Sequence, residues 1–178
     1  TITNSTNYGI LADNSSWYGG GDVYIDQNTI SGTSTAYSRG IYHHTYSGSG
    51  DVSITNNTIS GFHYGISTSS YYTTGSMTID QNTISGGTGA YSYGIYHYNY
   101  SGSGDVSITN NTISEIYYGV YTYSHSSTGD VIVDQNDIAG ISTAHGFGIH
   151  YQSNGSGDGS ITNNTISEFF NGISTYSY

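Results

Sequence analysis

Apolar and polar residues follow a short pattern that returns six times in this chain of 178 residues. Each copy reads Val-x-Ile, then two polar residues, then Asn-Thr-Ile-Ser or a close variant. The period of two residues in Val-x-Ile and in Thr-Ile-Ser predicts two strands that each bury one face. The repeated asparagines are Asn28, Asn57, Asn82, Asn111, Asn136 and Asn164.

A third strand is predicted later in each copy, where Gly is followed by Ile or Val. Three short strands in about 25 to 29 residues make one coil of a β-solenoid. One coil cannot bury its own apolar face, so the coils must stack, roughly 4.8 Å apart, into a continuous core. The pattern therefore predicts an all-β protein, a right-handed parallel β-helix of about six coils with ladders of identical apolar side chains inside.

The repeated Asn is expected at the sharp bend between the first two strands of each coil. Asn tolerates the left-handed backbone region that such a bend requires. Stacked Asn amides also donate and accept hydrogen bonds along a column, as they do in cross-β stacks. We therefore predict that the six asparagines form a structural ladder.

Coils of two kinds alternate along the chain. The coils of Asn28, Asn82 and Asn136 read Asp-Gln-Asn or its equivalent, and the others read Thr-Asn-Asn. The segment from the ladder Asn to the next Gly-Ile or Gly-Val pair is longer in the first kind, by four positions. The full period is two coils, or about 54 residues, and the longer segments are expected to form a ridge along one side.

The motif Val-x-Ile-x-x-Asn-Thr-Ile-Ser with a later Gly-Ile covers almost the whole chain and resembles the parallel β-helix repeats of the pectin-lyase-like superfamily. It is especially similar to long repeat proteins of microbial cell surfaces. The resemblance implies the fold but does not select a function, because enzymes, tailspikes, adhesins and filaments share it. In the family's polysaccharide lyases and hydrolases, Asp or Glu cluster with Arg or Lys on one outer face.

No such cluster is expected here, because Arg39 is the only Lys or Arg in the chain. A pair of hydrolytic carboxylates also needs a defined separation and two different environments. Asp26, Asp80 and Asp134 instead recur in every second coil, which indicates a structural role. We therefore predict that the protein is not an enzyme.

A second acidic column precedes the first strand of most coils. Calcium takes oxygen ligands and would relieve the repulsion between carboxylates stacked about 5 Å apart. The competing interpretation is that each carboxylate caps a turn and faces water, and the glycine-rich nonapeptide of calcium-binding solenoids is absent. No other cofactor is expected. The candidate calcium ligands are Asp22, Asp51, Asp105, Asp130 and Asp158.

The composition limits the classes of partner that the protein can bind and argues against insertion into a membrane. The chain has no Cys, no Pro and a formal net charge of −11. A nucleic-acid partner needs a basic surface, so it is excluded, and no apolar run approaches the roughly 20 residues of a membrane-spanning helix. We expect residues 1–178 to form a single solenoid domain, uncapped at both ends, within a longer chain or in a fibre of stacked subunits.

Histidine and tyrosine form no clear site in the sequence. His43 and His97 hold equivalent positions two coils apart, with Tyr151 in the third, and are expected at the surface or at strand ends. The 21 tyrosines gather around the third strand, where exposed rings suit lateral packing or stacking on sugars. Strand propensity is the alternative explanation. No zinc or copper site is predicted, because the following do not align: His44, His63, His125 and His145.

N-linked glycosylation is the sharpest site hypothesis. Asn56, Asn110 and Asn163 directly precede the ladder Asn and are expected to point outward at the bend. Gln holds that position in the intervening coils, so glycans on these residues would stand roughly 10 Å apart, with room for a sugar on each. The seven Asn-x-Ser/Thr sequons are at Asn4, Asn14, Asn56, Asn99, Asn110, Asn154 and Asn163.

These features favour a glycosylated structural subunit of an extracellular filament or cell-surface fibre, assembled by end-to-end stacking or by continuation of the chain. Its expected partners are copies of itself, with glycans as a second candidate. The alternative is an adhesin or carbohydrate-binding module that uses the tyrosines and the ridge. A third interpretation is ice binding through outward hydroxyl ladders, made by Thr29, Thr58, Thr83, Thr112 and Thr165.

Overall fold

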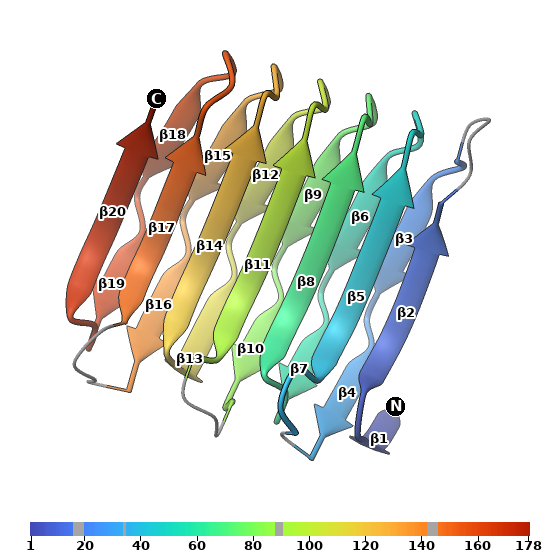
Figure 1. The fold of residues 1–178 in the computed structure, drawn as a ribbon. Helices are drawn as coiled ribbons and strands as arrows, with labels where there is room; N and C mark the ends of the chain where they lie inside the picture. Colours follow the sequence, from blue (N-terminus) through green and yellow to red (C-terminus); the bar gives the residue numbers. More distant parts are fainter. Residues whose placement is uncertain (16–19, 34, 88–90, 142–145) are drawn as a thin grey trace.

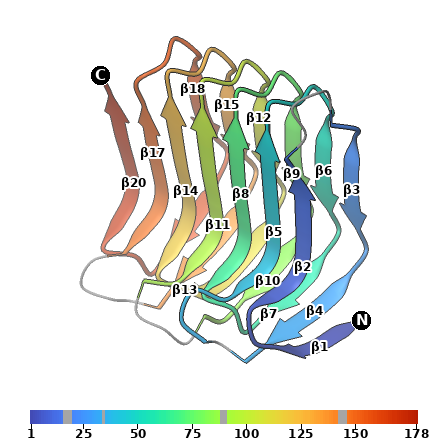
Figure 2. The ribbon, with the colours of Figure 1, turned by 45° about the vertical axis from the view of Figure 1, so that its right-hand side comes forward.

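The computed structural model describes residues 1–15, 20–33, 35–87, 91–141 and 146–178. In this part of the chain every helix or strand assigned is a β-strand, and the strands wind into one solenoid (Figure 1). Figures 1 and 2 show the coils stacked along one axis, with the two termini in the coils at opposite ends. Within the described residues, no helix could cross a bilayer.

The strands form three parallel sheets, each with one strand per coil. The Val-x-Ile sheet contains β3 (Val23–Asp26), β6 (Val52–Thr55), β9 (Met77–Asp80), β12 (Val106–Thr109), β15 (Val131–Asp134) and β18 (Gly159–Thr162). The Thr-Ile-Ser sheet contains β1 (Ile2–Ser5), β4 (Thr29–Gly32), β7 (Thr58–Ser60), β10 (Thr83–Ser85), β13 (Thr112–Ile116), β16 (Asp137–Gly140) and β19 (Thr165–Ser167). The long-strand sheet contains β2 (Tyr8–Asn14), β5 (Arg39–Tyr46), β8 (Tyr64–Tyr71), β11 (Tyr93–Tyr100), β14 (Tyr118–His125), β17 (Phe147–Ser153) and β20 (Asn171–Ser177).

Equivalent residues of successive coils pair directly, so the repeat in the sequence becomes a set of ladders. Ile54 pairs with Ile79, and Ile79 in turn lies beside Ile108. These three side chains have no exposed surface. Full burial of an Ile contributes roughly 1.5–3 kcal/mol relative to exposure, so the columns hold neighbouring coils together. The predicted fold class, with three strands per coil, is confirmed.

The glycine that opens each third strand is required by close packing. A Cβ on Gly94 would lie 2.5 Å from the Ile113 side chain and 2.7 Å from the Gly119 carbonyl oxygen of the next coil. Any larger residue would therefore push the long-strand sheet away from the Thr-Ile-Ser sheet. The Gly-Ile signature in the sequence marks a point where an Ile side chain of the Thr-Ile-Ser sheet reaches the backbone of the long-strand sheet.

The third strand differs from the sequence prediction in its length. The third strand has seven or eight residues and is the longest of each coil, because it continues past the apolar residue along inward His, Thr, Asn and Ser. At the corner before this strand, the shorter coils bury Phe62 and Ile116 in the core. The predicted ridge of the longer coils falls partly on residues 34, 88–90 and 142–145, which lie outside the described residues.

Candidate functional site

The ladder asparagines form a hydrogen-bonded column inside the bend. The Asn57 side-chain oxygen accepts from the Asn28 backbone N–H at 2.9 Å and from the Asn28 amide at 3.1 Å. The Asn57 amide donates to the Ile25 carbonyl at 2.8 Å and to the Asn82 oxygen at 3.0 Å. The same oxygen-accepting pattern continues to Asn164. Each amide in the middle of the column is thus engaged on both its nitrogen and its oxygen.

The left-handed backbone conformation lies one residue earlier than predicted. Asn56 has φ of 54° and Gln81 has φ of 56°, whereas the ladder residues Asn57 and Asn82 have negative φ. The bend is therefore made by the residue before the ladder Asn. This leaves the ladder residue free to direct its amide inward, where it has about 1% of its surface exposed.

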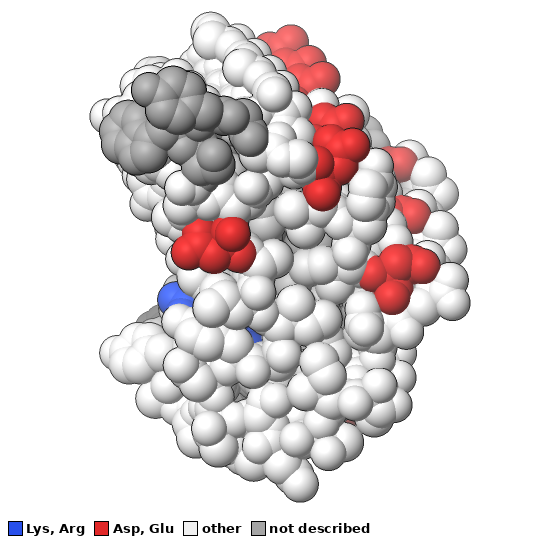
Figure 3. Space-filling model, turned by 90° about the vertical axis from the view of Figure 1, so that its right-hand side faces the viewer, with Lys and Arg blue, Asp and Glu red and all other residues white. Residues whose placement is uncertain are grey.

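Four of the five candidate calcium ligands cap the backbone of the neighbouring coil. Asp22 Oδ1 accepts the Asp51 N–H at 2.9 Å, and Asp51 Oδ1 accepts the Ser76 N–H at 2.8 Å. Asp105 and Asp130 accept from the next coil in the same way. In the described part of the chain, no three His, Asp or Glu side chains are grouped so that they could hold a metal ion. The acids on the face drawn in Figure 3 also lie in separate patches, so calcium binding stays a prediction.

The acids of every second coil bind the residues around the sequon. Asp26 Oδ1 accepts from the Asn56 amide at 2.9 Å and from the Thr55 hydroxyl at 2.8 Å. These hydrogen bonds lower the pKa of the Asp26 carboxyl, with Asn56 as the largest cause. Asp80 and Asp134 repeat the arrangement. The repeating acids therefore fix the bend from outside.

The structure separates the predicted glycosylation sites into two groups. Asn56, Asn110 and Asn163 are exposed at the bends, and Asn4 is exposed within strand β1. Asn99 is 3% exposed and lies inside the solenoid, so the prediction of a glycan there is wrong for the folded chain.

Two further sequons are only half-buried. The Asn14 amide donates to the Gly21 carbonyl at 2.9 Å, and the Asn154 oxygen accepts the Ser126 N–H at 2.8 Å. Because both side chains are half-buried, they are poorer acceptors for a glycan than the exposed residues at the bends.

Two histidines expected at the surface are buried instead. His43 has none of its surface exposed and His97 has 1%. Burial lowers the pKa of each to about 4. His97 Nδ1 lies 2.8 Å from the Thr68 hydroxyl, but His97 Nε2 and both ring nitrogens of His43 have no hydrogen-bond partner. The prediction failed because inward positions of this strand are polar. His145 lies outside the described residues.

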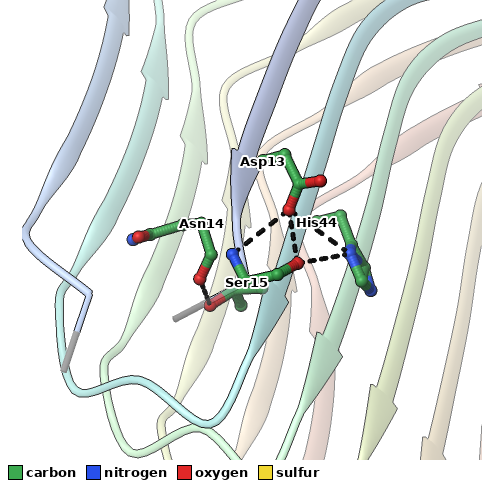
Figure 4. Close-up of polar contacts among 5 residues, drawn as sticks. Asp13, Asn14, Ser15 and His44 are labelled. Carbon is green, nitrogen blue, oxygen red and sulfur yellow. Dashed lines mark hydrogen bonds and ion pairs between the residues drawn. The ribbon is translucent and has the colours of Figure 1, made fainter. Parts of the chain in front are cut away.

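One cluster contains the residue types of a hydrolytic triad (Figure 4). The Ser15 hydroxyl donates to the Asp13 carboxylate, and Ser15 Oγ lies 3.1 Å from His44 Nδ1. The same His44 nitrogen lies 3.7 Å from Asp13 Oδ1. In a working triad the serine and the acid engage opposite nitrogens of the imidazole. Here both face Nδ1 and Ser15 already donates its proton to Asp13, so the arrangement does not activate a nucleophile.

The outer face of the long-strand sheet carries stacked aromatic rings. In one column the ring centroids of Tyr64 and Tyr93 are 5.0 Å apart, and those of Tyr93 and Tyr118 are 4.7 Å apart. A second column places Tyr96 and Tyr121 5.4 Å apart with nearly parallel rings. Stacked rings of this kind stabilise the sheet and give it an aromatic surface.

Strand β8 interrupts two of these columns. Ser67 pairs with Tyr42 and with Tyr96, and Ser69 pairs with His44 and Tyr98. The two small side chains leave a cavity of about 310 Å³, which we term the serine notch. Aligned third strands show the break in the sequence, since Ser-x-Ser replaces an aromatic pair. The notch is lined by Arg39, Tyr64, Ser67, Ser69, Tyr71, Tyr96 and Tyr98.

The chain's single Arg lies beside this break. The Arg39 guanidinium carbon is 4.5 Å from the ring centroid of Tyr42 and 5.3 Å from that of Tyr64, distances typical of a cation–π contact. Its Nε is buried without a hydrogen-bond partner. Among the described residues Arg39 forms no salt bridge. The notch therefore combines aromatic walls, hydroxyl groups and an unneutralised cation, and it is the best candidate for a binding site.

The structure also shows how the threonines of the predicted ice-binding ladder are arranged. Thr58, Thr83 and Thr112 pair in register and are exposed on the Thr-Ile-Ser sheet. Asp137 continues the column in place of Thr, so a carboxylate interrupts the hydroxyl ladder. Ice binding stays a prediction, for which thermal hysteresis is the direct measurement.

Comparison with known proteins agrees with this architecture. The sequence profile of a family described as a right-handed β-helix region matches residues 1–178. No curated protein and no solved structure matches the chain. The profile confirms the predicted resemblance to right-handed parallel β-helix repeat proteins and leaves function to be argued from the residues themselves.

Proposed function

The chain belongs to the right-handed β-helix family, and on that premise we propose that it is a non-catalytic structural shaft of an extracellular filament or cell-surface fibre. The family includes both enzymes and structural proteins, so membership alone does not decide between them. The observation that carries the proposal is the Asn column, whose hydrogen bonds pass through every coil from Asn28 to Asn164 without a break.

The coil nearest the C-terminus supports stacking of a further coil. Its strands β18, β19 and β20 each pair on one side only. A hollow of about 460 Å³ lies there, lined in part by Tyr151, Ile161 and Ile173, and Ile173 is 52% exposed. A coil in the same register would cover these apolar groups and pair the open strand edges. Either a continuing chain or a second copy of the protein would supply it.

The contacts of the acidic residues support a non-catalytic role. The recurring carboxylates accept hydrogen bonds from the scaffold, as Asp26 and Asp51 do. The Asp13, Ser15 and His44 cluster lacks the two-sided imidazole contact that activates a serine. A hydrolytic site would need at least one acid or base free for the substrate, held in a separate environment from its partner.

We propose further that the shaft is extracellular and carries glycans at its exposed bends. Asn56 and Asn110 are exposed and lie two coils apart, with Gln81 between them. Glycans on alternate coils would have roughly 10 Å of axial room each. Mass measurement of the native protein before and after deglycosidase treatment tests this part, and an unchanged mass would contradict it.

Electron microscopy of the native material tests the shaft itself. We expect long uniform fibres with an axial repeat of about 4.8 Å, because the same inter-coil bonds would continue along the whole fibre. Compact particles no longer than the coils of this chain would contradict the proposal.

Glycan binding is the second candidate function, and the serine notch is the observation that favours it. The notch has both aromatic and hydroxyl lining on an outer face of the solenoid. A glycan array probed with the folded protein tests this candidate. Binding to at least one class of saccharide is expected, and a blank array would contradict it.

A further inference from the structure

We propose that the serine notch binds a single neutral pyranose residue, whose ring fills the position of the missing aromatic side chains on β8. This inference rests on glycan binding, the second function proposed above. It goes further by naming the site, the ligand class and the residues that select it.

The shape of the notch follows from the coil spacing. Strands β5 and β11 flank β8, so their outward rings are two strand spacings apart, roughly 9.6 Å. Tyr42 and Tyr96 stand on either side of Ser67 in the paired register. In the next interval of this column an aromatic ring is present, since Tyr121 stacks on Tyr96. One flat ligand ring would restore that spacing.

Tyr64 and Tyr71 close the two ends of the notch along the strand. Tyr64 meets Tyr96 edge to face at 5.8 Å, and Tyr71 lies 5.5 Å from Tyr98. The cavity of about 310 Å³ is at the lower end of the range of small-molecule sites. The enclosure therefore suits one sugar ring better than a long bound chain.

The chemistry of the lining matches a pyranose. The faces of a sugar ring present C–H groups, which pack on aromatic rings, and its edges present hydroxyls. Ser67 and Ser69 form the floor, where Ser67 is 3% exposed and Ser69 is half-buried. The hydroxyl of each can both donate and accept. Burial is the first cause that raises the pKa of Tyr96 to about 12, so its phenol stays protonated and can donate at neutral pH.

Charge favours a neutral sugar. Arg39 offers N–H donors to ring or hydroxyl oxygens from one side of the notch. The chain as a whole carries a formal charge of −11, and this field repels polyanionic glycans at long range. One guanidinium that already packs on Tyr42 does not reverse that field.

Saturation-transfer NMR with methyl pyranosides tests the proposal, because a single sugar is expected to bind weakly, at roughly millimolar Kd. The probes are the methyl glycosides of glucose, galactose and mannose, with methyl glucuronoside as the anionic comparison. Ser67→Tyr fills the notch with the residue that Tyr42 and Tyr96 already place in this column. Ser69→Tyr fills it independently, so the test does not depend on one variant.

Ser174→Tyr is the matched control, since Ser174 lies in the same column beside His150 on β20, away from the notch. We expect a neutral pyranoside to bind the wild type and Ser174→Tyr equally, and to lose at least about tenfold in affinity in both notch variants. Arg39→Gln is expected to weaken binding by about tenfold while the circular dichroism spectrum stays unchanged.

Three results would overturn the proposal. Unchanged binding in Ser67→Tyr and Ser69→Tyr would remove the notch as the site but leave glycan binding elsewhere intact. Binding of the glucuronoside alone would overturn the assignment of a neutral ligand. Absence of binding to every probe, together with a blank glycan array, would contradict both this inference and the second proposed function.

Discussion

Two polar columns run through the interior of this solenoid, and they differ in how well they are satisfied. In the Asn column, buried residues such as Asn57 and Asn82 use both the nitrogen and the oxygen of their amides. In the long-strand sheet, His43, Thr68 and His97 follow one another inside, and three ring nitrogens have no partner. A buried polar column is fully bonded here only where every coil supplies the same side chain.

The difference has a geometric cause. An amide carries a donor and an acceptor on one rigid group, so identical amides one coil apart can bond to each other indefinitely. His and Thr alternate in the second column, and only the contact of Thr68 with His97 forms. The unpaired groups retain a desolvation cost of about 1–3 kcal/mol each. The Asn column should therefore stabilise the fold. The column of alternating His and Thr, which we term the mixed column, should weaken it.

The largest effect is expected when the Asn column is broken. Asn82→Ala removes the acceptor of the Asn57 backbone N–H and the donor to the Ile54 carbonyl. Both groups would be left buried, so we expect a loss of about 3–5 kcal/mol in the free energy of unfolding, measured by urea denaturation. Thr83→Ala, an exposed neighbour, is the control, with an expected change of under about 0.5 kcal/mol. A loss of under about 1 kcal/mol in Asn82→Ala would contradict this prediction.

Acid should destabilise the mixed column. The folded pKa values of His43 and His97 are about 4, below the value near 6.5 expected in the unfolded chain. The unfolded state therefore binds protons more readily, and stability is full above about pH 6.5 and falls as the pH drops toward 4. At about 1.36 kcal/mol per pKa unit, the loss is about 3 kcal/mol for each histidine.

His97→Thr, which copies Thr68 and Thr122 of the same column, should remove about half of the mixed column's share of the pH dependence between pH 6.5 and 4. The share of His63 and His150, whose pKa values burial also lowers, should remain. Thr122→Ser, which changes the same column without a titratable group, is the control and should leave the slope in place. Carboxylates such as Asp26, whose pKa is lowered, change the stability only as the pH falls below their unfolded pKa near 3.8. Their contribution therefore lies below the window from pH 6.5 to 4. Equal slopes in wild type and His97→Thr would show that His97 does not titrate on unfolding.

A smaller effect is expected at Asn99, whose side-chain oxygen is buried without a partner. Asn99→Ser copies Ser70 and Ser124, which hold the same position in the adjacent coils. Removing the unpaired oxygen should leave the free energy of unfolding unchanged or raise it by up to about 1 kcal/mol. Thermal unfolding followed by circular dichroism measures this change. A decrease of more than about 1 kcal/mol would mean that Asn99 is as well bonded as the ladder asparagines.

The smallest effect is expected outside the solenoid, at the acids that cap neighbouring coils. Asp51→Ala removes the acceptor of the Ser76 N–H, but both groups are exposed and water replaces the bond. We expect a loss of about 0.5 kcal/mol in urea denaturation. Calcium should leave the midpoint unchanged in wild type. A rise in the midpoint that Asp51→Ala abolishes would instead support a calcium site in this column.

The fold could be predicted because the sequence pattern that specifies it is periodic. The Val-x-Ile, Asn-Thr-Ile-Ser and Gly-Ile segments specify inward apolar positions in every coil, and one coil cannot be stable without the next. The Asn ladder followed from the same periodicity, because Asn recurs at one position in every coil. The location of the left-handed residue did not, since Asn56 and Asn57 are adjacent asparagines and Gln81 is an unusual residue for that conformation.

The polar interior and the serine notch were harder to predict. In the sequence, apolarity is the sign of an inward position, and this criterion places His43 and His97 outside although they follow the inward Ile41 and Ile95 by two residues. The notch depends on which aromatic rings stand beside Ser67 across two coils. That neighbour relation becomes visible only when the third strands are aligned in register, and the role of Arg39 requires the side-chain packing itself.

Amide hydrogen exchange of the asparagine side chains, followed by NMR, tests whether a fully bonded Asn column holds the shaft together. We predict slow exchange at Asn57, Asn82 and Asn111, whose amides are buried and bonded, and faster exchange at Asn56 and Asn110, whose bonded amides are exposed to water. Equal exchange rates in the two sets would contradict it.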